Sequence, residues 1–405
     1  MSPTTSHCQV LVVGAGPAGG SLASLLACQG IDVLLIDRLV DLSQVAFSSA
    51  ALPRSAVERF GLPASVQAAQ WRGWQLVGPG DSKRRWDSSE SLGAVLDFGK
   101  LRQWLAEQAQ AAGARLQLGL TALGCSERSD GAMVTALRGP GGEPTTITSD
   151  WVVDASGEGR ALLGDPPDHA LVGGVGVEWL LQVDPQRWRP WSERLTFFMG
   201  SHWVQQGYGW IFPMEAGLLK LGVCRLKDGR RSQPSLGQEL QQLLQRNGLA
   251  DATVLDRHGG RIRSTIRRRE PHRRGRLVGL GDVVSTANLL GGEGIRHALL
   301  AAEVLAPLLA EAVRSGGAGA RWLGPRSLDR YEASLRRALG WRWSLSGRLA
   351  RRTWLGLNGP RGDERLEKLL SGLAGCSASD LSALLFDYRF ERYGSRALPY
   401  LLGWR

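Results

Sequence analysis

The chain has few cysteines and no long apolar segment. Only five of its 405 residues are cysteines, they are scattered, and no two have the Cys-x-x-Cys spacing. Such a set excludes a disulfide framework and a cysteine zinc site, and it suits a reducing cytosol. No apolar run approaches the roughly 20 residues that span a bilayer. The first nine residues are polar and carry no basic segment, so we also expect no signal peptide.

Histidines and nucleic-acid-binding motifs are equally sparse. The chain has six histidines, and His202, His258 and His272 have no neighbours at the spacing of metal ligands. We therefore expect no metal site, and we interpret these histidines as structural or exposed. No motif of a nucleic-acid-binding module is present, so we expect no nucleic-acid partner.

Acidic residues are outnumbered by basic ones. The chain has 49 Lys and Arg against 38 Asp and Glu, which gives a net charge of +11. The excess is concentrated in residues 261–276 and in the tryptophan-containing stretch 341–354. One interpretation is a solvated, arginine-rich surface, and the other is a face that contacts anionic lipid or an anionic substrate.

The stretch from residue 10 to residue 27 has the pattern of a dinucleotide-binding turn. Four apolar residues precede Gly14-Ala-Gly16-Pro-Ala18-Gly19, and a run of small and apolar residues follows. In a strand–turn–helix unit, Gly14 permits the tight turn, Gly16 lets a pyrophosphate approach the backbone, and Gly19 lets the helix lie close to the sheet. The helix N-terminus would face the phosphates.

A second predicted strand, residues 32–37, ends in an acid. Asp37 follows Gly19 by 18 residues, where an acid is expected to accept hydrogen bonds from ribose hydroxyls. Together these features predict a dinucleotide site. The alternative is a βαβ unit whose glycines are incidental.

Three later segments add small residues and acids at strand ends. Residues 151–160 form an apolar run that ends in Asp154-Ala-Ser-Gly157, and residues 276–282 form another that ends in Asp282. Gly291-Gly-Glu-Gly-Ile295 then opens a long predicted helix, which makes a second cradle for the far end of a dinucleotide. Ligands collect at the carboxyl ends of parallel strands, so we expect these segments at one site.

The segment from about residue 170 to residue 223 has a β pattern rich in tryptophan. Within it, Tyr208, Trp210 and Phe212 alternate, so on a strand they would share one face. They form either the wall of a ligand pocket or ordinary core. We also predict strands of an inserted sheet in residues 71–96, an amphipathic helix over residues 100–112, and a mostly helical chain from residue 298 to residue 405.

In this order, the motifs resemble those of FAD-dependent oxidoreductases of the glutathione-reductase-like superfamily, in the p-hydroxybenzoate-hydroxylase-like branch. Within that branch they are most similar to the geranylgeranyl reductase family, which carries a YxWxFP box that matches residues 208–213. The resemblance covers about the first 310 residues. It implies that FAD is bound by residues of the motifs named above and by their neighbours, namely Gly14, Gly16, Ala18, Gly19, Asp37, Arg38, Asp154, Asp282, Gly292, Gly294 and Ile295.

The resemblance also assigns a substrate pocket and a candidate catalytic residue. The pocket box falls on Tyr208, Trp210, Phe212 and Pro213. Glu293 is the candidate for orienting the flavin edge or relaying a proton. The alternative role for Glu293 is capping the N-terminus of its helix.

Several positions depart from the family pattern. Ser285 and Leu289 stand where the family usually has glycine and proline, and Ser48-Ser-Ala50 aligns with its Cys-Gly-Gly segment. A family arginine falls on Phe98, with Lys100 and Arg102 as candidates to replace it.

These observations predict an α/β fold. We expect a Rossmann-like FAD-binding domain from residues 1–168 and 256–310, a second, mostly β substrate domain at 169–255, and a helical C-terminal region at 311–405. The expected location is the cytoplasm, with peripheral membrane contact through the basic, tryptophan-rich C-terminal helices.

The expected function is reduction of prenyl or other isoprenoid double bonds by hydride from reduced flavin, with an apolar small molecule as substrate. Because no second GxGxxG is present, NAD(P)H would bind transiently, or reduced ferredoxin would be the donor. The alternatives are a monooxygenase or halogenase-like enzyme, a lycopene-cyclase-like enzyme, and a non-catalytic FAD-binding protein.

Overall fold

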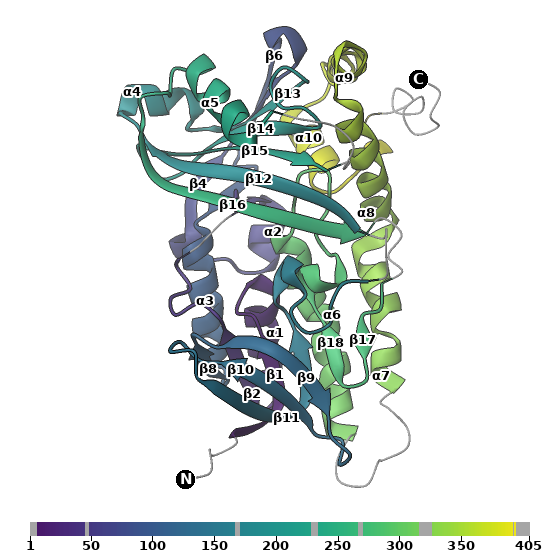
Figure 1. The fold of residues 1–405 in the computed structure, drawn as a ribbon. Coiled ribbons are helices and arrows are strands. Elements are labelled where there is room, and N and C mark those ends of the chain that lie inside the picture. Colours follow the sequence, from purple (N-terminus) through teal and green to yellow (C-terminus); the bar gives the residue numbers. More distant parts are fainter. Residues whose placement is uncertain are drawn as a thin grey trace.

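A computed structural model of the chain describes residues 6–44, 48–166, 171–227, 234–265, 270–315, 326–391 and 393. The predicted helical segments 316–325 and 394–405 and part of the arginine-rich block, 266–269, lie outside the described residues. Figure 1 shows an elongated molecule with one large sheet at each end and the C-terminal helices along one side.

The first sheet contains the dinucleotide-type turn. Its main strand order is β17-β18-β11-β1-β2-β8, and β10 and β9 extend it from β11 as an antiparallel pair. Pairing among β18, β11, β1, β2 and β8 is parallel throughout. Strand β1 is covered on both faces, which explains its unbroken apolar run. The strands are β1 (Ser6–Val13), β2 (Val33–Asp37), β8 (Arg115–Leu118), β9 (Thr121–Glu127), β10 (Met133–Arg138), β11 (Pro144–Asp154), β17 (Arg273–Arg274) and β18 (Leu277–Gly279).

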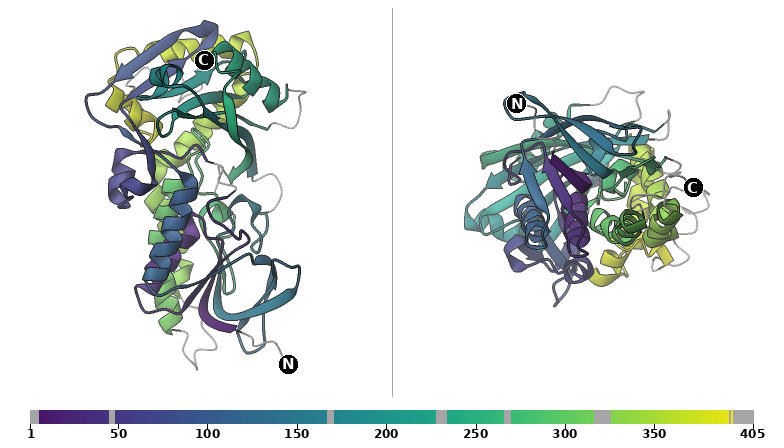
Figure 2. Two further views of the ribbon diagram at one scale, coloured as in Figure 1. Left: turned by 90° about the vertical axis from the view of Figure 1, so that its left-hand side faces the viewer. Right: turned by 90° about the horizontal axis from the view of Figure 1, so that it is seen from below.

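Three helices lie side by side along this sheet, as the right view of Figure 2 shows. They are α1 (Pro17–Ala27), α3 (Phe98–Ala111) and α6 (Ile295–Ser315), and α1 packs against both others. Close packing needs Gly20, because a Cβ there would lie 3.0 Å from Cβ of Leu105 on α3. The small residues of α1 therefore set the distance between the helices.

The second sheet has seven strands in the order β16-β12-β15-β14-β13-β5-β6. All neighbours are antiparallel except β13 and β5. The strands are β5 (Gly73–Val77), β6 (Lys83–Asp87), β12 (Leu171–Gln182), β13 (Arg194–Met199), β14 (Gly207–Pro213), β15 (Leu218–Leu226) and β16 (Thr253–Thr265). Helix α5 (Leu236–Arg246) covers one of its faces. Strands β5 and β6 of this sheet come from residues 1–168, which were predicted to lie in the FAD-binding domain. Strand β16 spans residue 256, one of the predicted boundaries. The division of the chain into domains therefore remains a prediction.

The remaining elements connect the two sheets. A small sheet is formed by β3 (Ala51–Pro53), β7 (Gly93–Leu96) and β4 (Gln67–Trp71). Short helices are α2 (Arg54–Arg59), α4 (Pro185–Trp188), η1 (Ala64–Val66), η2 (Pro79–Asp81), η3 (Gly157–Gly159), η4 (Arg189–Trp191) and η5 (Gly281–Val284). The C-terminal helices are α7 (Arg326–Asp329), α8 (Tyr331–Gly356), α9 (Pro360–Gly372) and α10 (Ala378–Leu385). Helix α8 contacts α6 and also β15, so it spans from one half to the other.

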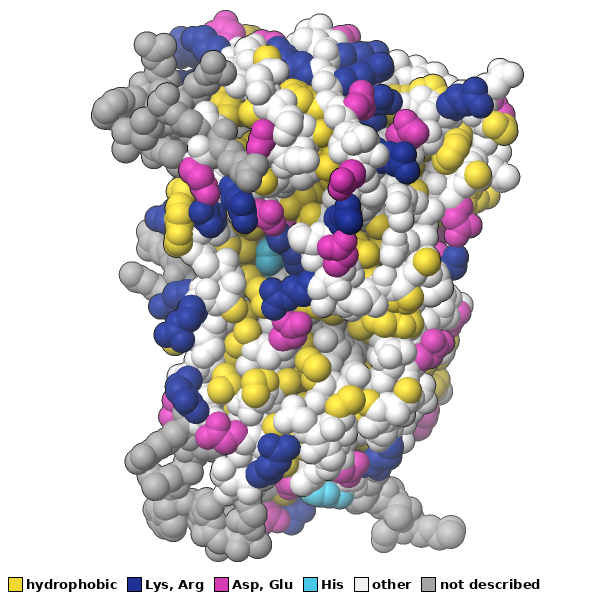
Figure 3. Space-filling view, turned by 180° about the vertical axis from the view of Figure 1, so that it is seen from behind, with side chains coloured by type: hydrophobic (Ala, Val, Ile, Leu, Met, Phe, Trp, Pro, Cys, Tyr) yellow, Lys and Arg dark blue, Asp and Glu magenta, His cyan; other side chains and the backbone are white. Residues whose placement is uncertain are grey.

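The architecture confirms the predicted fold class of a Rossmann-like half, a second β-rich half and C-terminal helices. None of the five cysteines forms a disulfide. Over the described ranges, no helix is both long and apolar enough to cross a bilayer. On the face seen in Figure 3, basic and acidic side chains are interspersed, which is typical of a solvated surface.

Candidate FAD and substrate site

Parallel pairing brings the three predicted turns to one edge of the first sheet. Val13 at the end of β1 is in register with Asp154 at the end of β11, and Asp154 is in register with Gly279 on β18. The turns that follow these strands therefore lie side by side, although they are more than 100 residues apart in sequence. They border a cavity of about 750 Å³.

The glycine turn has the steric pattern that a dinucleotide requires. Gly14 has a φ of 110°, and a Cβ there would lie 2.4 Å from the carbonyl oxygen of Ala155. A Cβ on Gly19 would lie 1.9 Å from the carbonyl oxygen of Gly14, so the protein itself requires glycine at both positions. A Cβ on Gly16 would meet no heavy atom within 4 Å, although Gly16 borders the cavity. The open space beside Gly16 fits a pyrophosphate that approaches the N-terminus of α1.

Asp37 is held at the same edge by backbone N–H groups. One carboxylate oxygen accepts from Ala15 N at 2.7 Å, and the other accepts from Leu39 N at 2.9 Å. Asp37 and Arg38 both line the cavity, as do Gly14 and Ala18. The structure thus brings the predicted adenosine end of the site together.

Arg102 is one of the two candidates for the missing family arginine, and the sequence did not decide between them. It lines the cavity and donates to the carbonyl of Gln44, and burial lowers the pKa of its guanidinium. Lys100 instead pairs with Glu215 at 2.9 Å, away from the cavity. Of the two candidates for the missing family arginine, the geometry favours Arg102.

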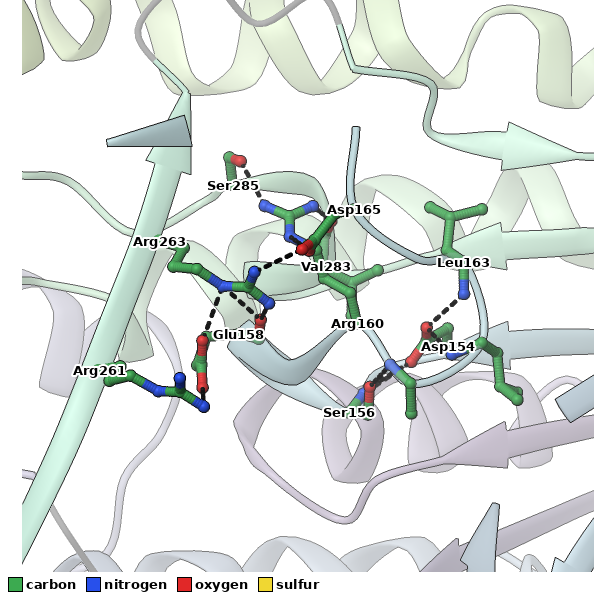
Figure 4. A network of polar contacts seen from close by, with 12 residues as sticks. Asp154, Ser156, Glu158, Arg160, Leu163, Asp165, Arg261, Arg263, Val283 and Ser285 are labelled. Carbon is green, nitrogen blue, oxygen red and sulfur yellow. Dashed lines mark hydrogen bonds and ion pairs between the residues drawn. The ribbon is translucent and has the colours of Figure 1, made fainter. Parts of the chain in front are cut away.

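Asp154 lies inside its own loop. Its carboxylate accepts from Ser156 Oγ at 2.6 Å and from the backbone N–H groups of Leu162 and Leu163, each at 2.8 Å (Figure 4). It is fully buried and does not border the cavity. Its visible role is to shape the loop that faces the cofactor cavity, and its predicted contact with the cofactor stays a prediction.

The far end of the cavity is formed by η5 and the start of α6. Asp282 lines it and accepts from Thr286 Oγ1 at 3.1 Å. Burial raises the pKa of Asp282, and Thr286, the backbone of Ala287 and the charge of Arg160 oppose that shift. Gly292, Gly294 and Ile295 line the same end. The helix N-terminus would stabilise negative charge on a reduced flavin ring.

Arg160 explains the serine at position 285. Ser285 has a left-handed backbone with a φ of 59°, where glycine is favoured. Its Oγ accepts from Arg160 Nη2 at 2.8 Å, and the Arg160 side chain also donates to the carbonyl of Val283 (Figure 4). Arg160 is itself left-handed and buried. The pair connects the loop after β11 to the turn that carries Asp282.

We expect Ser285→Ala to be more destabilising than Ser285→Gly. Both variants lose a hydrogen bond to a buried charge, which is worth about 1.5–3 kcal/mol. Only glycine relieves the left-handed backbone, by about 1 kcal/mol. Urea unfolding of the two variants and the native protein measures the order, and equal stability of native and Ser285→Gly proteins would contradict the assigned role of Arg160.

Glu293 is engaged by the C-terminal part of the chain. Its carboxylate pairs with Arg296 at 2.7 and 2.8 Å and accepts from the Tyr388 hydroxyl at 3.0 Å. Arg296 also contacts Asp387 at 3.3 Å and the carbonyl of Phe386. The predicted catalytic residue thus connects the start of α6 to the segment after α10.

A second, apolar cavity of about 280 Å³ adjoins the first. Tyr208, Trp210 and Phe212 line it from one face of β14, whereas Pro213 does not. The opposite wall comes from the C-terminal helices, with leucines at 349, 357, 366, 369, 370, 373, 381, 384 and 385. The sequence resemblance left this wall unassigned, because it ends near residue 310.

The two cavities share part of their lining. Both are bordered by Ser48, Ser49, Tyr208, Trp210, Trp354 and the segment Gly291–Ile295 without Glu293. Lys220 holds the serine loop, since its Nζ donates to the carbonyls of Ser48 at 2.8 Å and Leu96 at 3.2 Å. The end of the first cavity that is predicted to hold the flavin therefore opens onto the apolar cavity. In the described part of the chain, no acidic, histidine or cysteine cluster could hold a metal ion.

Comparison with known proteins agrees with this geometry. The profile of the family described as "FAD binding domain" matches residues 7–343. Digeranylgeranylglycerophospholipid reductase of Haloferax volcanii is 26% identical over 317 residues, which cover 75% of each chain.

Two solved structures share the fold. A geranylgeranyl bacteriochlorophyll reductase-like protein of Thermoplasma acidophilum has a TM-score of 0.81 and 20% identity, covering 97% of this chain and 98% of the other. A p-nitrophenol 4-monooxygenase of Pseudomonas putida has a TM-score of 0.70 and 18% identity, covering 96% and 99%. The resemblance inferred from the motifs is confirmed. The chain is a member of the FAD binding domain family of oxidoreductases, with FAD as its cofactor.

Proposed function

We propose that the chain reduces carbon–carbon double bonds of a prenyl or other isoprenoid substrate. The observation that carries this proposal is the junction of the two cavities, where an apolar cavity opens onto the flavin end of the cofactor cavity. The similarity to reductases of geranylgeranyl compounds supports it.

We propose that the side chains of the apolar cavity have two roles, substrate binding and proton transfer. Tyr208, Trp210 and Phe212 would hold an apolar chain against the leucines of the C-terminal helices and exclude water. When bound, FAD supplies the hydride chemistry. Glu293 borders the apolar cavity and shares a hydrogen bond with the Tyr388 hydroxyl, so we propose that this pair orients the flavin edge or relays a proton.

The electron donor is part of the proposal. We propose transient reduction by NAD(P)H or by reduced ferredoxin, because the chain carries one GxGxxG only. Anaerobic mixing of the holoenzyme with each donor, followed by the flavin absorbance, distinguishes the two. Lack of reduction by both would contradict this choice of donors.

The substrate is tested with a reduced holoenzyme. We expect anaerobic enzyme, reduced by dithionite, to convert a geranylgeranyl compound to products heavier by two hydrogens per double bond, with flavin reoxidation. In a parallel assay in air, oxygen uptake with a hydroxylated product would favour a monooxygenase or halogenase-like enzyme. An isomeric product in the anaerobic assay would favour a lycopene-cyclase-like enzyme. Tightly bound FAD that no donor reduces would indicate a non-catalytic FAD-binding protein.

We further propose a cytoplasmic enzyme that contacts membranes peripherally, where isoprenoid lipids are found. Trp341 is 66% exposed on α8, and Arg342 lies beside it. An exposed indole among basic side chains is typical of an interfacial contact.

We expect the protein to sediment with anionic vesicles and to be released by salt, because screening weakens attraction between charges. Trp341→Ser should reduce the bound fraction without altering FAD content. Binding that is absent at low salt, or the same for both proteins, would contradict a contact through this part of α8.

A further inference from the structure

Trp210 is held across the second sheet by a carboxylate two strands away. Its Nε1 donates to Oε2 of Glu178 at 3.0 Å. Glu178 on β12 and Trp210 on β14 are both in register with Gly222 on the strand between them, β15. A Cβ on Gly222 would lie 2.2 Å from Cζ2 of Trp210, so the indole lies directly over this glycine. Gly222 thus leaves the space through which Trp210 reaches Glu178.

The indole also stands where the two cavities meet. Trp210 lines both of them, and its neighbours on the same face, Tyr208 and Phe212, have ring centroids 5.9 and 6.4 Å away. Without a partner for Nε1, the χ2 torsion of a tryptophan has two broad alternatives. The hydrogen bond to Glu178 selects one of them. Glu178 therefore determines which edge of the Trp210 ring faces the two cavities.

Burying a carboxylate at position 178 is energetically unfavourable. Glu178 is 2% exposed, and burial raises the pKa of its carboxyl, opposed by the charges of Lys220 and His258 and by the Trp210 hydrogen bond. An apolar side chain of similar size would be tolerated more easily in a sheet interior. Two partners explain the acid at this position, namely the Trp210 indole N–H and the buried ammonium of Lys220, whose charge it offsets.

We propose that Glu178 is a positioning residue that fixes the Trp210 ring and thereby sets the width of the passage between the cofactor cavity and the apolar cavity. It does not line either cavity, so it acts on the substrate through its contact with Trp210. Its effect on prenyl chains rests on the proposed function. Its effect on the indole does not.

The substrate arm compares Glu178→Leu and Glu178→Gln in the native and Trp210→Phe backgrounds. Binding of geranylgeraniol to the oxidised holoenzyme is measured first, because no reduction is needed. In Glu178→Leu the indole is free to turn toward water in the empty cavity, and substrate binding must return it with its N–H unpaired, so we expect binding about tenfold weaker. Glu178→Gln keeps an acceptor and should restore most of the affinity. With turnover, KM should rise by the same factor while kcat changes little.

The indole arm uses ¹⁵N-labelled tryptophan in the holoprotein. The signal of Trp210 is identified by its loss in Trp210→Phe. Trp203 lies on the other face of the sheet, so Trp203→Phe is the matched control. We expect Glu178→Leu to move this signal upfield as the hydrogen bond is lost. Glu178→Gln should move it less.

Two results would overturn the proposal. One is an indole signal that Glu178→Leu does not move. The other is an equal loss of binding on adding Glu178→Leu to Trp210→Phe, because the acid would then act by a route other than Trp210. If reduced enzyme converts no prenyl compound, the proposed function fails, but both arms still decide the role of Glu178.

Discussion

A Gly16→Val variant is expected to fold normally and to bind FAD about 100-fold more weakly or worse. Gly16 has a φ of −77°, which valine can adopt, and a Cβ there meets no protein atom within 4 Å. The side chain would instead occupy the space in which the pyrophosphate approaches the backbone, and each 1.4 kcal/mol lost is tenfold in affinity. Fluorescence titration of the apoprotein with FAD measures the loss, and circular dichroism monitors the fold.

Two glycines provide matched controls for this variant. Gly124→Val on β9 also adds a side chain to open space, but away from the cavity, so FAD affinity should not change. Gly19→Val should impair folding instead, because its Cβ would lie 1.9 Å from the Gly14 carbonyl. Normal FAD affinity of a folded Gly16→Val protein would show that the pyrophosphate lies elsewhere.

An Arg296→Met variant is expected to lose about 3–5 kcal/mol of unfolding free energy, because removing one partner leaves a buried charge uncompensated. The side chains of Arg296 and Glu293 are only 18% and 8% exposed. Arg296 also contacts Asp387 and the Phe386 carbonyl, so its loss would loosen the segment after α10 from α6. Urea unfolding measures the stability.

Arg336→Met is the matched control. Arg336 pairs with Glu332 on α8, but their side chains are 57% and 43% exposed, and such pairs contribute little in water. We expect no resolvable change in its unfolding midpoint. Similar losses for the two variants would mean that the Arg296 pair is no more important than a surface pair.

The cofactor half of the site could be predicted because parallel strands impose its geometry. The turns after Val13, Asp154 and Gly279 needed only the rule that ligands collect at strand carboxyl ends. Asp154 shows the limit of that rule, since an acid at this edge can turn into its own loop and bind backbone N–H groups.

The substrate half could be predicted on one side only. Alternation placed Tyr208, Trp210 and Phe212 on one face, because the period of a strand is fixed. The leucines of α9, such as Leu366 and Leu370, follow an ordinary amphipathic pattern, and nothing in that pattern says which surface they cover. Pairs such as Arg160 and Ser285 depend on contacts across 125 residues, which local sequence does not encode.

The family match ends at residue 343, whereas the helical wall of the apolar cavity begins at Leu349. The lining of the apolar cavity is therefore divided, because Tyr208, Trp210 and Phe212 lie inside the matched residues and the helical wall follows them. Exchanging residues 344–393 for those of a relative is expected to change the helical wall and to leave the aromatic face of β14 and the glycine turn after β1 in place. Such an exchange must keep contacts that cross the seam, such as those of Arg296 and Glu293 with residues 386–388 and that of Arg84 with Glu367.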